Sequence, residues 1–215
     1  MKAAPTPLTV AVLAKAPVPG LAKTRLIPAL GAAGAARLQR QFTQRTLRTA
    51  LRSGLGPVAL WCAPDAQHRF FQALQRVLPV ALHNQPSGDL GQRMLTALAA
   101  ASPQGPVLLV GTDCPALSPA HLQAAAQALR QGADVVCQAA EDGGYVLIGM
   151  HQPQPVLFAD MPWSTAEVMA RTRTRAQGAG LRLHELPALW DVDNPEDLPR
   201  WQALHESETQ CNDVY

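Results

Sequence analysis

The chain is poor in charged residues. Only 16% of its 215 residues are Asp, Glu, Lys or Arg, against roughly 25% in a typical soluble domain, and the net charge is +2. A protein that binds nucleic acid needs a concentrated basic surface. The charge here is too small and too dispersed for one, so we expect no nucleic-acid partner.

Long apolar segments are also missing near the N-terminus. The longest apolar run there is Leu8–Ala14, far below the ~20 residues that span a bilayer, and we expect no membrane span. Lys2, this run and Ala14-Lys15-Ala16 imitate a secretory signal. The run is short, however, and cleavage after Ala16 would remove what we predict to be the first core strand. We therefore expect no secretory signal.

The cysteines are few and show no pairing pattern. They stand at positions 62, 114, 137 and 211, with neither Cys-x-x-Cys spacing nor the spacing of a metal site. This usage predicts reduced thiols in a cytoplasmic protein. Cys114 follows Asp113, whose charge would raise the pKa of the thiol and make it a poor nucleophile.

Two common nucleotide-binding motifs are absent. A Walker A motif needs glycine directly before Lys-Ser/Thr, whereas Ala22 precedes Lys23 here and Gly20 lies three residues away. The dinucleotide fingerprint Gly-x-Gly-x-x-Gly is missing as well. These absences exclude a P-loop NTPase and an NAD-type Rossmann site.

The hydrophobic fraction of 47% is enough for a sizeable core, and the length predicts one domain over residues 1–215, with the core at about 8–204 and a loose polar tail. Apolar runs predict strands at 8–14, 57–62, 80–82, 107–110, 133–139, 143–150 and 181–186. Helical patterns occupy 31–52, 67–77, 90–101 and about 119–130. Two further helices are predicted to begin at a capping box, Ser164 to Glu167, and at an Asn194 cap.

Strands and helices alternate through most of the chain. This order predicts an α/β fold with a mostly parallel sheet, helices on both faces and a small antiparallel addition at Gly143–Met150. Ligands of such sheets bind beyond the carboxyl ends of the strands. The residues that follow the strands are therefore the candidates for chemistry.

A basic loop follows the first predicted strand. It contains Lys15, Gly20, Lys23 and Arg25, and the only other lysine among 18 Lys and Arg residues is Lys2. Lysine is a compact point charge suited to phosphate, and a glycine-containing loop can turn backbone N–H groups toward an anion. The loop predicts a phosphate site; the alternative is an ordinary solvated basic loop.

Acidic residues follow the later strands. Asp113 comes after Val107–Val110 and suits Mg²⁺ or Mn²⁺, or else is a turn residue that bonds its own backbone. Asp142 precedes two glycines, either beside a ligand or in a hairpin turn. Asp191 and Asp193 lie on one side of an extended segment, where paired acids need a neutralising cation; alternatively, Asp193 only supports the Asn194 cap.

Six motifs occur in order over residues 8 to about 198 and resemble a family. They are the run from Ala14 to Leu26, Gly88-Asp89-Leu90-Gly91-Gln92-Arg93-Met94, Gly111-Thr112-Asp113-Cys114-Pro115, the run from Asp142 to Gly149, Trp163-Ser164-Thr165, and the run from Asp191 to Leu198. The sequence resembles the bacterial GT-A-type nucleotide-diphospho-sugar transferase-like proteins, which are often named glycosyltransferases.

The resemblance implies a GT-A, Rossmann-like fold and a metal-dependent transferase that takes a nucleotide-sugar or an NTP and a small-molecule acceptor. It implies phosphate binding by Lys15, Lys23 and Arg25 beside Gly20, and a position near the nucleotide for Asp89 and Arg93. Mg²⁺ or Mn²⁺ would be held by Asp113 with Asp191 or Asp193. Asp142 would line the acceptor side and accept a proton, while Lys23 and Arg25 stabilise the leaving diphosphate.

One departure from the GT-A pattern keeps alternatives open. A complete Asp-x-Asp motif would need an acid at 115, where this chain has Pro115. A single acid followed by proline is closer to the related molybdenum-cofactor and phospholactate guanylyltransferases, which join a nucleotide to a phosphorylated acceptor. A non-catalytic nucleotide-binding module is the third alternative, and the sequence leaves the oligomeric state open.

Overall fold

The computed structural model describes residues 7–212, with side chains up to residue 208; Lys2 and the side chain of Cys211 lie outside the described part. Its strands form one seven-stranded sheet in the order β3-β2-β1-β4-β6-β5-β7. The strands are β1 Thr9–Lys15, β2 Val58–Ala63, β3 Val80–Asn84, β4 Val107–Val110, β5 Val135–Ala140, β6 Tyr145–Met150 and β7 Leu183–Leu189. Only β6 runs antiparallel to its neighbours, β4 and β5. The predicted α/β class and its antiparallel addition are confirmed.

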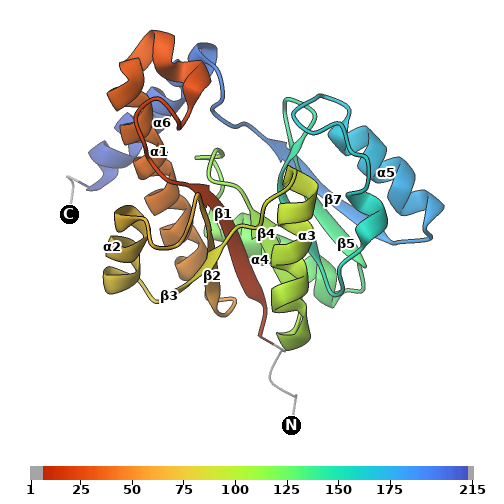
Figure 1. The fold of residues 1–215 in the computed structure, drawn as a ribbon. Helices are drawn as coiled ribbons and strands as arrows, with labels where there is room; N and C mark the ends of the chain where they lie inside the picture. Colours follow the sequence, from red (N-terminus) through yellow and green to blue (C-terminus); the bar gives the residue numbers. More distant parts are fainter. Residues whose placement is uncertain (1–6, 213–215) are drawn as a thin grey trace.

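The principal helices cover both faces of the sheet (Figure 1). They are α1 Ile27–Arg52, α2 Arg69–Val77, α3 Leu90–Ala101, α4 Pro119–Arg130, α5 Val168–Gly178 and α6 Leu198–Asn212. Alternate residues of β1 explain the two layers. Val10 and Val12 pack into the core beneath α1, α2 and α4, whereas Ala11 packs into the core beneath α3 and α5.

Helix α6 packs against the start of α1 through a third apolar cluster. Phe42 and Trp201 meet edge to face, with 5.0 Å between their ring centroids, and Val192 is fully buried beside them. This cluster anchors the segment between β7 and α6 above the carboxyl end of the sheet. Helix α6 continues to Asn212, beyond Glu206, where the sequence predicted a loose tail.

Three helix starts differ from the sequence predictions in their details. Helix α1 begins at Ile27, four residues early, and Gly31 interrupts it with a φ of 68°. Helix α5 begins at Val168, and the predicted capping box is absent, because Ser164 lies in the left-handed region (φ 64°) and Thr165 donates its hydroxyl to Pro162 O at 2.8 Å. Before α6, Asn194 does form a capping box, with Asp197, but over a short 3₁₀ turn.

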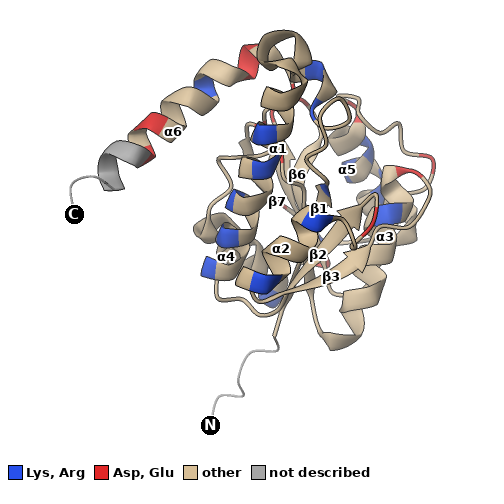
Figure 2. Ribbon diagram, turned by 60° about the vertical axis from the view of Figure 1, so that its left-hand side comes forward, with Lys and Arg blue, Asp and Glu red and all other residues tan. Residues whose placement is uncertain are grey.

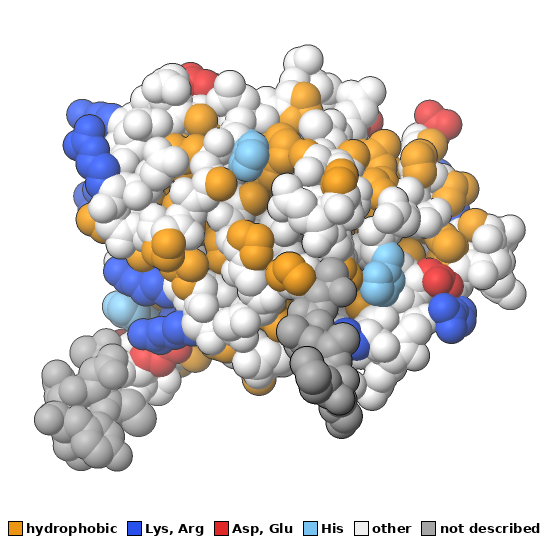
Figure 3. All heavy atoms as spheres, turned by 90° about the horizontal axis from the view of Figure 1, so that it is seen from below, with side chains coloured by type: hydrophobic (Ala, Val, Ile, Leu, Met, Phe, Trp, Pro, Cys, Tyr) orange, Lys and Arg blue, Asp and Glu red, His pale blue; other side chains and the backbone are white. Residues whose placement is uncertain are grey.

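The charged side chains are spread unevenly over the molecule. Figure 2 shows basic residues along α1, namely Arg37, Arg40, Arg45, Arg48 and Arg52. Arg45 is engaged there by Glu208, with both bonds at 2.6 Å. The face seen from below in Figure 3, at the amino end of the parallel strands, shows mostly hydrophobic and uncharged groups across its middle. Between residues 7 and 212, no helix combines the length and hydropathy that crossing a membrane requires.

Candidate functional site

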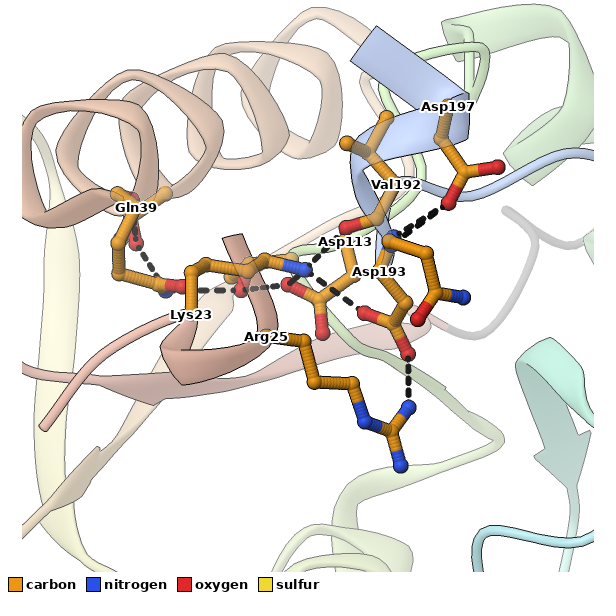
Figure 4. Close-up of polar contacts among 10 residues, drawn as sticks. Lys23, Arg25, Gln39, Asp113, Val192, Asp193 and Asp197 are labelled. Atoms are coloured by element: carbon orange, nitrogen blue, oxygen red, sulfur yellow. Dashed lines mark hydrogen bonds and ion pairs between the residues drawn. The ribbon is translucent and has the colours of Figure 1, made fainter. Parts of the chain in front are cut away.

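Three loops meet at the carboxyl end of the sheet, and Lys23 joins them (Figure 4). Its ammonium lies 2.6 Å from Val192 O, 2.8 Å from Asp113 Oδ1 and 2.9 Å from Asp193 Oδ1. An ammonium has three N–H donors, and here each has an acceptor. The basic loop after β1, the loop after β4 and the segment after β7 are therefore tied together by one side chain.

The Lys23 side chain is only 6% exposed. Burial alone would lower the pKa of Lys23, but the charges of Asp113 and Asp193 and its hydrogen bonds to them outweigh burial, so the pKa is raised. The residue is also held in the left-handed region, at φ 47° and ψ 48°. Non-glycine residues adopt that conformation at a cost of about 1–2 kcal/mol.

A buried polar chain holds Asp113 from the other side. Gln39 of α1 is 3% exposed and donates from Nε2 to Thr112 Oγ1 at 3.1 Å, and Thr112 donates to Asp113 Oδ1 at 3.4 Å. The backbone N–H of Val192 donates to Asp113 O at 2.9 Å. Asp113 is thus fixed between α1 and the segment after β7, with its side chain 45% exposed.

Two further carboxylates, those of Asp142 and Asp191, gather around Asp193 beside this ion pair. Asp142, Asp191 and Asp193 each offer an oxygen atom, and the three atoms lie within 4.8 Å of one another. The ion pairs found among the described residues reach Asp193, through Lys23 and Arg25, but neither Asp142 nor Asp191. The metal set predicted from sequence contained Asp113 in place of Asp142. The fold instead groups Asp142 with Asp191 and Asp193 and places Asp113 on Lys23.

The pKa of Asp191 reflects this crowding. Burial raises the pKa of Asp191 to about 7, and the carboxylates of Asp142, Asp193 and Asp113 contribute in the same direction. Three acids held this closely repel one another in their charged form, which a bound cation would relieve, and oxygen donors are the ligands that Mg²⁺ and Mn²⁺ prefer. The donor set therefore fits a divalent cation.

We expect Asp191 to make the cation-free protein less stable as the pH rises. An unfolded Asp titrates near 3.8, so between about pH 4 and pH 7 the folded chain binds more protons than the unfolded one, and stability falls across that window before levelling off. Asp191→Asn removes this pH-dependent loss of stability. With chelator present, the free energy of unfolding of the variant at pH 8 should exceed that of wild type by about 1–2 kcal/mol, a value reduced for solvent screening. This corresponds to a Tm higher by about 4 °C.

The check is the Tm difference between Asp191→Asn and wild type at pH 8 and pH 4. The difference should shrink toward zero at pH 4, where the folded carboxyl is protonated and the unfolded one is only partly ionised. Glu196→Gln, which changes an exposed acid in the same segment, is the matched control and should give no pH-dependent difference. A Tm gain of equal size at both pH values would contradict the assignment.

Two adjoining hollows open at this edge of the sheet. The first, of about 400 Å³, is lined by basic and polar groups that include Lys15, Lys23, Arg25 and Arg93. The second, of about 280 Å³, contains the acid cluster and an apolar wall. Asp113, Asp193 and Arg25 line both, so one charged partition separates a cationic space from an acidic one.

The remaining predicted residues take different places. Lys15 is exposed at the end of β1, and Gly20 sits in the loop with a φ of 81°. Arg93 donates to Gly88 O at 3.1 Å while lining the first hollow. Asp89 lines neither hollow. It is the N-cap of α3 and accepts the Gln92 N–H at 2.8 Å.

Sequence reasoning assigned no role to the apolar wall of the second hollow. Tyr145 and Trp163 lie in motifs that carried the family resemblance, and Met94 ends a third. Their position in those motifs was the signal that could have identified the apolar wall. Hydrophobic periodicity could not identify it, because Trp163 belongs to a loop and Met94 has the pattern of an ordinary core residue of a helix. Cys114 also lines this hollow, and burial, ahead of the nearby acids, raises the pKa of its thiol to about 12.

Comparison with known proteins places the chain in a family. Residues 46–165, more than half of the chain, match the profile described as "Uncharacterized protein conserved in bacteria (DUF2064)". The chain belongs to this family. A crystal structure from Desulfovibrio desulfuricans G20, of a protein provisionally named a nucleotide-diphospho-sugar transferase, is 30% identical, with 87% of this chain and 82% of that one covered and a TM-score of 0.79.

More distant structures share the fold of this DUF2064 protein. A nucleotidyl transferase from Methanothermobacter thermautotrophicus is 20% identical over 94% of this chain and 98% of its own, with a TM-score of 0.66. A 4-diphosphocytidyl-2C-methyl-D-erythritol synthase from Anaerococcus prevotii is 12% identical over 94% and 99%, with a TM-score of 0.63. No curated protein matches the chain significantly.

Proposed function

We propose that the protein is a nucleotide-dependent transferase that moves a sugar from a nucleotide-diphospho-sugar to a small acceptor with the help of Mg²⁺ or Mn²⁺. One observation carries the proposal: a cation-lined hollow and a cluster of carboxylates share the partition formed by Asp113, Asp193 and Arg25. The name given to the 30% identical relative is in keeping with it.

The first hollow suits the diphosphate. Lys15 is exposed and has no ion pair among the described residues, and Arg25 is 60% exposed with a long 3.6 Å contact to Asp193. These two cations, with Arg93, line the first hollow and retain N–H donors that can turn toward phosphate oxygens. Lys23 does not, because its three donors are occupied. We therefore assign Lys23 the task of positioning Asp113 and Asp193 and of lending its charge to the site.

Asp191 and Asp193 are the ligands that we assign to the divalent cation, with Asp142 within reach of both. Asp113 and Asp193 both contact Lys23 through Oδ1, but Asp193 also belongs to the acid cluster, whereas Asp113 does not. When bound, the ion supplies positive charge that stabilises a departing diphosphate. Arg25 and Arg93, which line the first hollow, would add their charge to that of the ion.

Asp142 lines the second hollow and is the most exposed member of the acid cluster. One of its oxygens accepts the Gly144 N–H at 2.9 Å, which leaves the other for an acceptor hydroxyl. In the proposed step the acceptor oxygen bonds to the sugar's anomeric carbon. The bond from that carbon to the diphosphate oxygen breaks with its electron pair, and the hydroxyl proton passes to Asp142.

Nucleotidyl transfer is the second candidate, favoured by Pro115 in place of the second acid of an Asp-x-Asp motif. In that reaction a phosphorylated acceptor would attack the α-phosphate of an NTP and release pyrophosphate. A non-catalytic nucleotide-binding module would use the first hollow alone and would not depend on the acids.

Thermal shifts with a nucleotide panel, with Mg²⁺, Mn²⁺ or chelator, test these candidates. Nucleoside diphosphates and their sugar conjugates should stabilise the protein only with metal, by about 2.7 kcal/mol at 100-fold excess over Kd. Stabilisation by triphosphates, with pyrophosphate release on adding a phosphorylated acceptor, would favour nucleotidyl transfer instead. A thermal shift of the same size with and without metal would favour the binding module. No thermal shift with any nucleotide would contradict all three candidate functions.

A further inference from the structure

The second hollow differs from the first in the character of its wall. Besides four acids, Arg25, Ser164 and Thr165, it is lined largely by apolar side chains, namely Leu13, Leu90, Met94, Leu109, Val146 and Val168, together with Tyr145 and Trp163. These residues come from the ends of β1 and β4 and from α3, β6, α5 and the loop before α5. At about 280 Å³ the hollow lies at the lower end of small-molecule sites, which fits a ligand of modest size.

The two aromatic residues direct their polar atoms away from solvent. Tyr145 donates its hydroxyl toward Met94 Sδ at 4.0 Å, and burial raises the pKa of Tyr145 well above its ordinary value. The indole Nε1 of Trp163 is buried with no hydrogen-bond partner among the described residues. The surface that Trp163 exposes is therefore not its N–H. The aromatic wall offers carbon, so it selects an apolar group rather than a row of hydroxyls.

The charge of the hollow excludes an anionic ligand group. Four aspartates line it, at 113, 142, 191 and 193, against one basic residue, Arg25. Arg25 already contacts Asp193 and also lines the first hollow. A divalent cation and Lys23 together bring the acids close to neutrality but leave no surplus for a phosphate on the acceptor. Such a group would be desolvated among carboxylates without a partner.

We propose that the second hollow binds an uncharged acceptor whose hydroxyl is attached to an apolar ring or chain, with the apolar part against Trp163 and Tyr145 and the hydroxyl toward Asp142. The role as acceptor rests on the function proposed above, whereas the binding preference rests on the wall and its charge alone. The preference selects transfer to a neutral alcohol over transfer to a phosphorylated acceptor.

Gly91 restricts where the indole of Trp163 can lie beside this hollow. A Cβ atom at this position of α3 would lie 2.8 Å from Trp163 Cζ2 and 3.1 Å from Phe158 O, so no larger residue fits unless Trp163 moves. Phe158 also packs against Trp163, with ring centroids 6.4 Å apart. The position of the indole, and with it the room for an acceptor, therefore depends on the absence of a side chain at residue 91.

The test uses ¹⁵N-labelled full-length protein with Mg²⁺ and three probes: 2-phenylethanol, 2-phenylethyl phosphate and glycerol. Binding is followed through the tryptophan indole resonances, and Trp163→Phe identifies the one from Trp163. 2-Phenylethanol should shift the Trp163 resonance and leave that of Trp201, in the cluster between α1 and α6, unchanged. 2-Phenylethanol should bind at least tenfold more tightly than either other probe. Trp163→Ala should raise the Kd for 2-phenylethanol tenfold or more.

A pair of charge substitutions tests the electrostatic part. Leu90 lines the hollow and is 43% exposed, whereas Val77 is 74% exposed at the end of α2, on the other face of the sheet. Leu90→Lys should tighten 2-phenylethyl phosphate about tenfold, and the matched Val77→Lys should leave its Kd unchanged. Equal effects of the two variants, or wild-type preference for the phosphate or for glycerol, would overturn the proposal.

The probe experiment needs neither nucleotide nor turnover, so its outcome separates from that of the proposed function. If UDP binds with metal but 2-phenylethanol does not reach Trp163, the acceptor class is wrong and the transferase proposal stands. If 2-phenylethanol binds as expected and no nucleotide stabilises the protein, the apolar site is real and the transferase proposal fails.

Discussion

An Asp193→Asn variant is expected to lose metal-dependent binding of nucleoside diphosphates by about 100-fold or more while remaining folded. Asp193 is the one carboxylate that belongs both to the Lys23 ion pair and to the acid cluster. Its amide counterpart cannot neutralise a cation, and even an outer partner of a metal ligand is worth 10–100-fold in affinity. Titration calorimetry with UDP and Mn²⁺ measures the loss.

Asp89→Asn is the matched control for this substitution. It makes the same chemical change at another residue predicted to lie near the nucleotide, but Asp89 caps α3 and lines neither hollow. Asparagine is an equally good N-cap, so stability should be kept as well. The assignment of Asp193 to the metal and nucleotide site would be wrong if Asp89→Asn lost as much affinity for UDP as Asp193→Asn, or if Asp193→Asn bound UDP as wild type does.

A Lys23→Met variant is expected to lose about 2 kcal/mol of stability at pH 7. Removing one partner of a buried ion pair typically costs 3–5 kcal/mol. The cost is smaller here because Asp113 and Asp193 are 45% and 34% exposed and water can hydrate them once the ammonium is gone. Urea unfolding in the presence of chelator measures the loss as a lower midpoint with an unchanged slope.

Lys15→Met is the control for the lysine substitution. Lys15 stands at the exposed end of β1 with no ion pair among the described residues, so its loss should leave the unfolding midpoint within about 0.5 kcal/mol of wild type. Mn²⁺ should restore part of the stability of Lys23→Met, because the four aspartates that line the second hollow then lack the positive charge of the Lys23 ammonium. A Lys23→Met variant as stable as wild type would show that the ammonium does not hold the three loops together.

The convergence of charged loops could be read from the sequence because it follows from topology. Parallel strands end at the same edge, so the basic loop after β1 and the acids after β4, β5 and β7 had to meet there. Lys23 and Asp113, separated by 90 positions in the sequence, lie 2.8 Å apart as a result. Strong local signals were equally dependable, such as Ser118 and Pro119 at the start of α4.

The separate roles of the charged residues in these loops could not be predicted in the same way. Lys15 and Lys23 are both lysines of one basic loop, yet one is exposed and the other is enclosed by three acceptors. The difference depends on Val192 and Asp193, which reach Lys23 only because α6 packs against α1 through Val192, Phe42 and Trp201. The failed capping box at Ser164 is another such case, since the loop before α5 packs Trp163 against Gly91 instead.

The order of strands, the placing of charge at their carboxyl ends and the family motifs were determined by the sequence alone, because hydrophobic period and turn chemistry act over short stretches of chain. The tertiary structure alone decided which carboxylates lie within reach of one another and that the apolar wall of the second hollow lies beside them. Side chains separated by about 50 to 170 positions come within contact distance only after the sheet has formed, and burial then influences their charge and their partners.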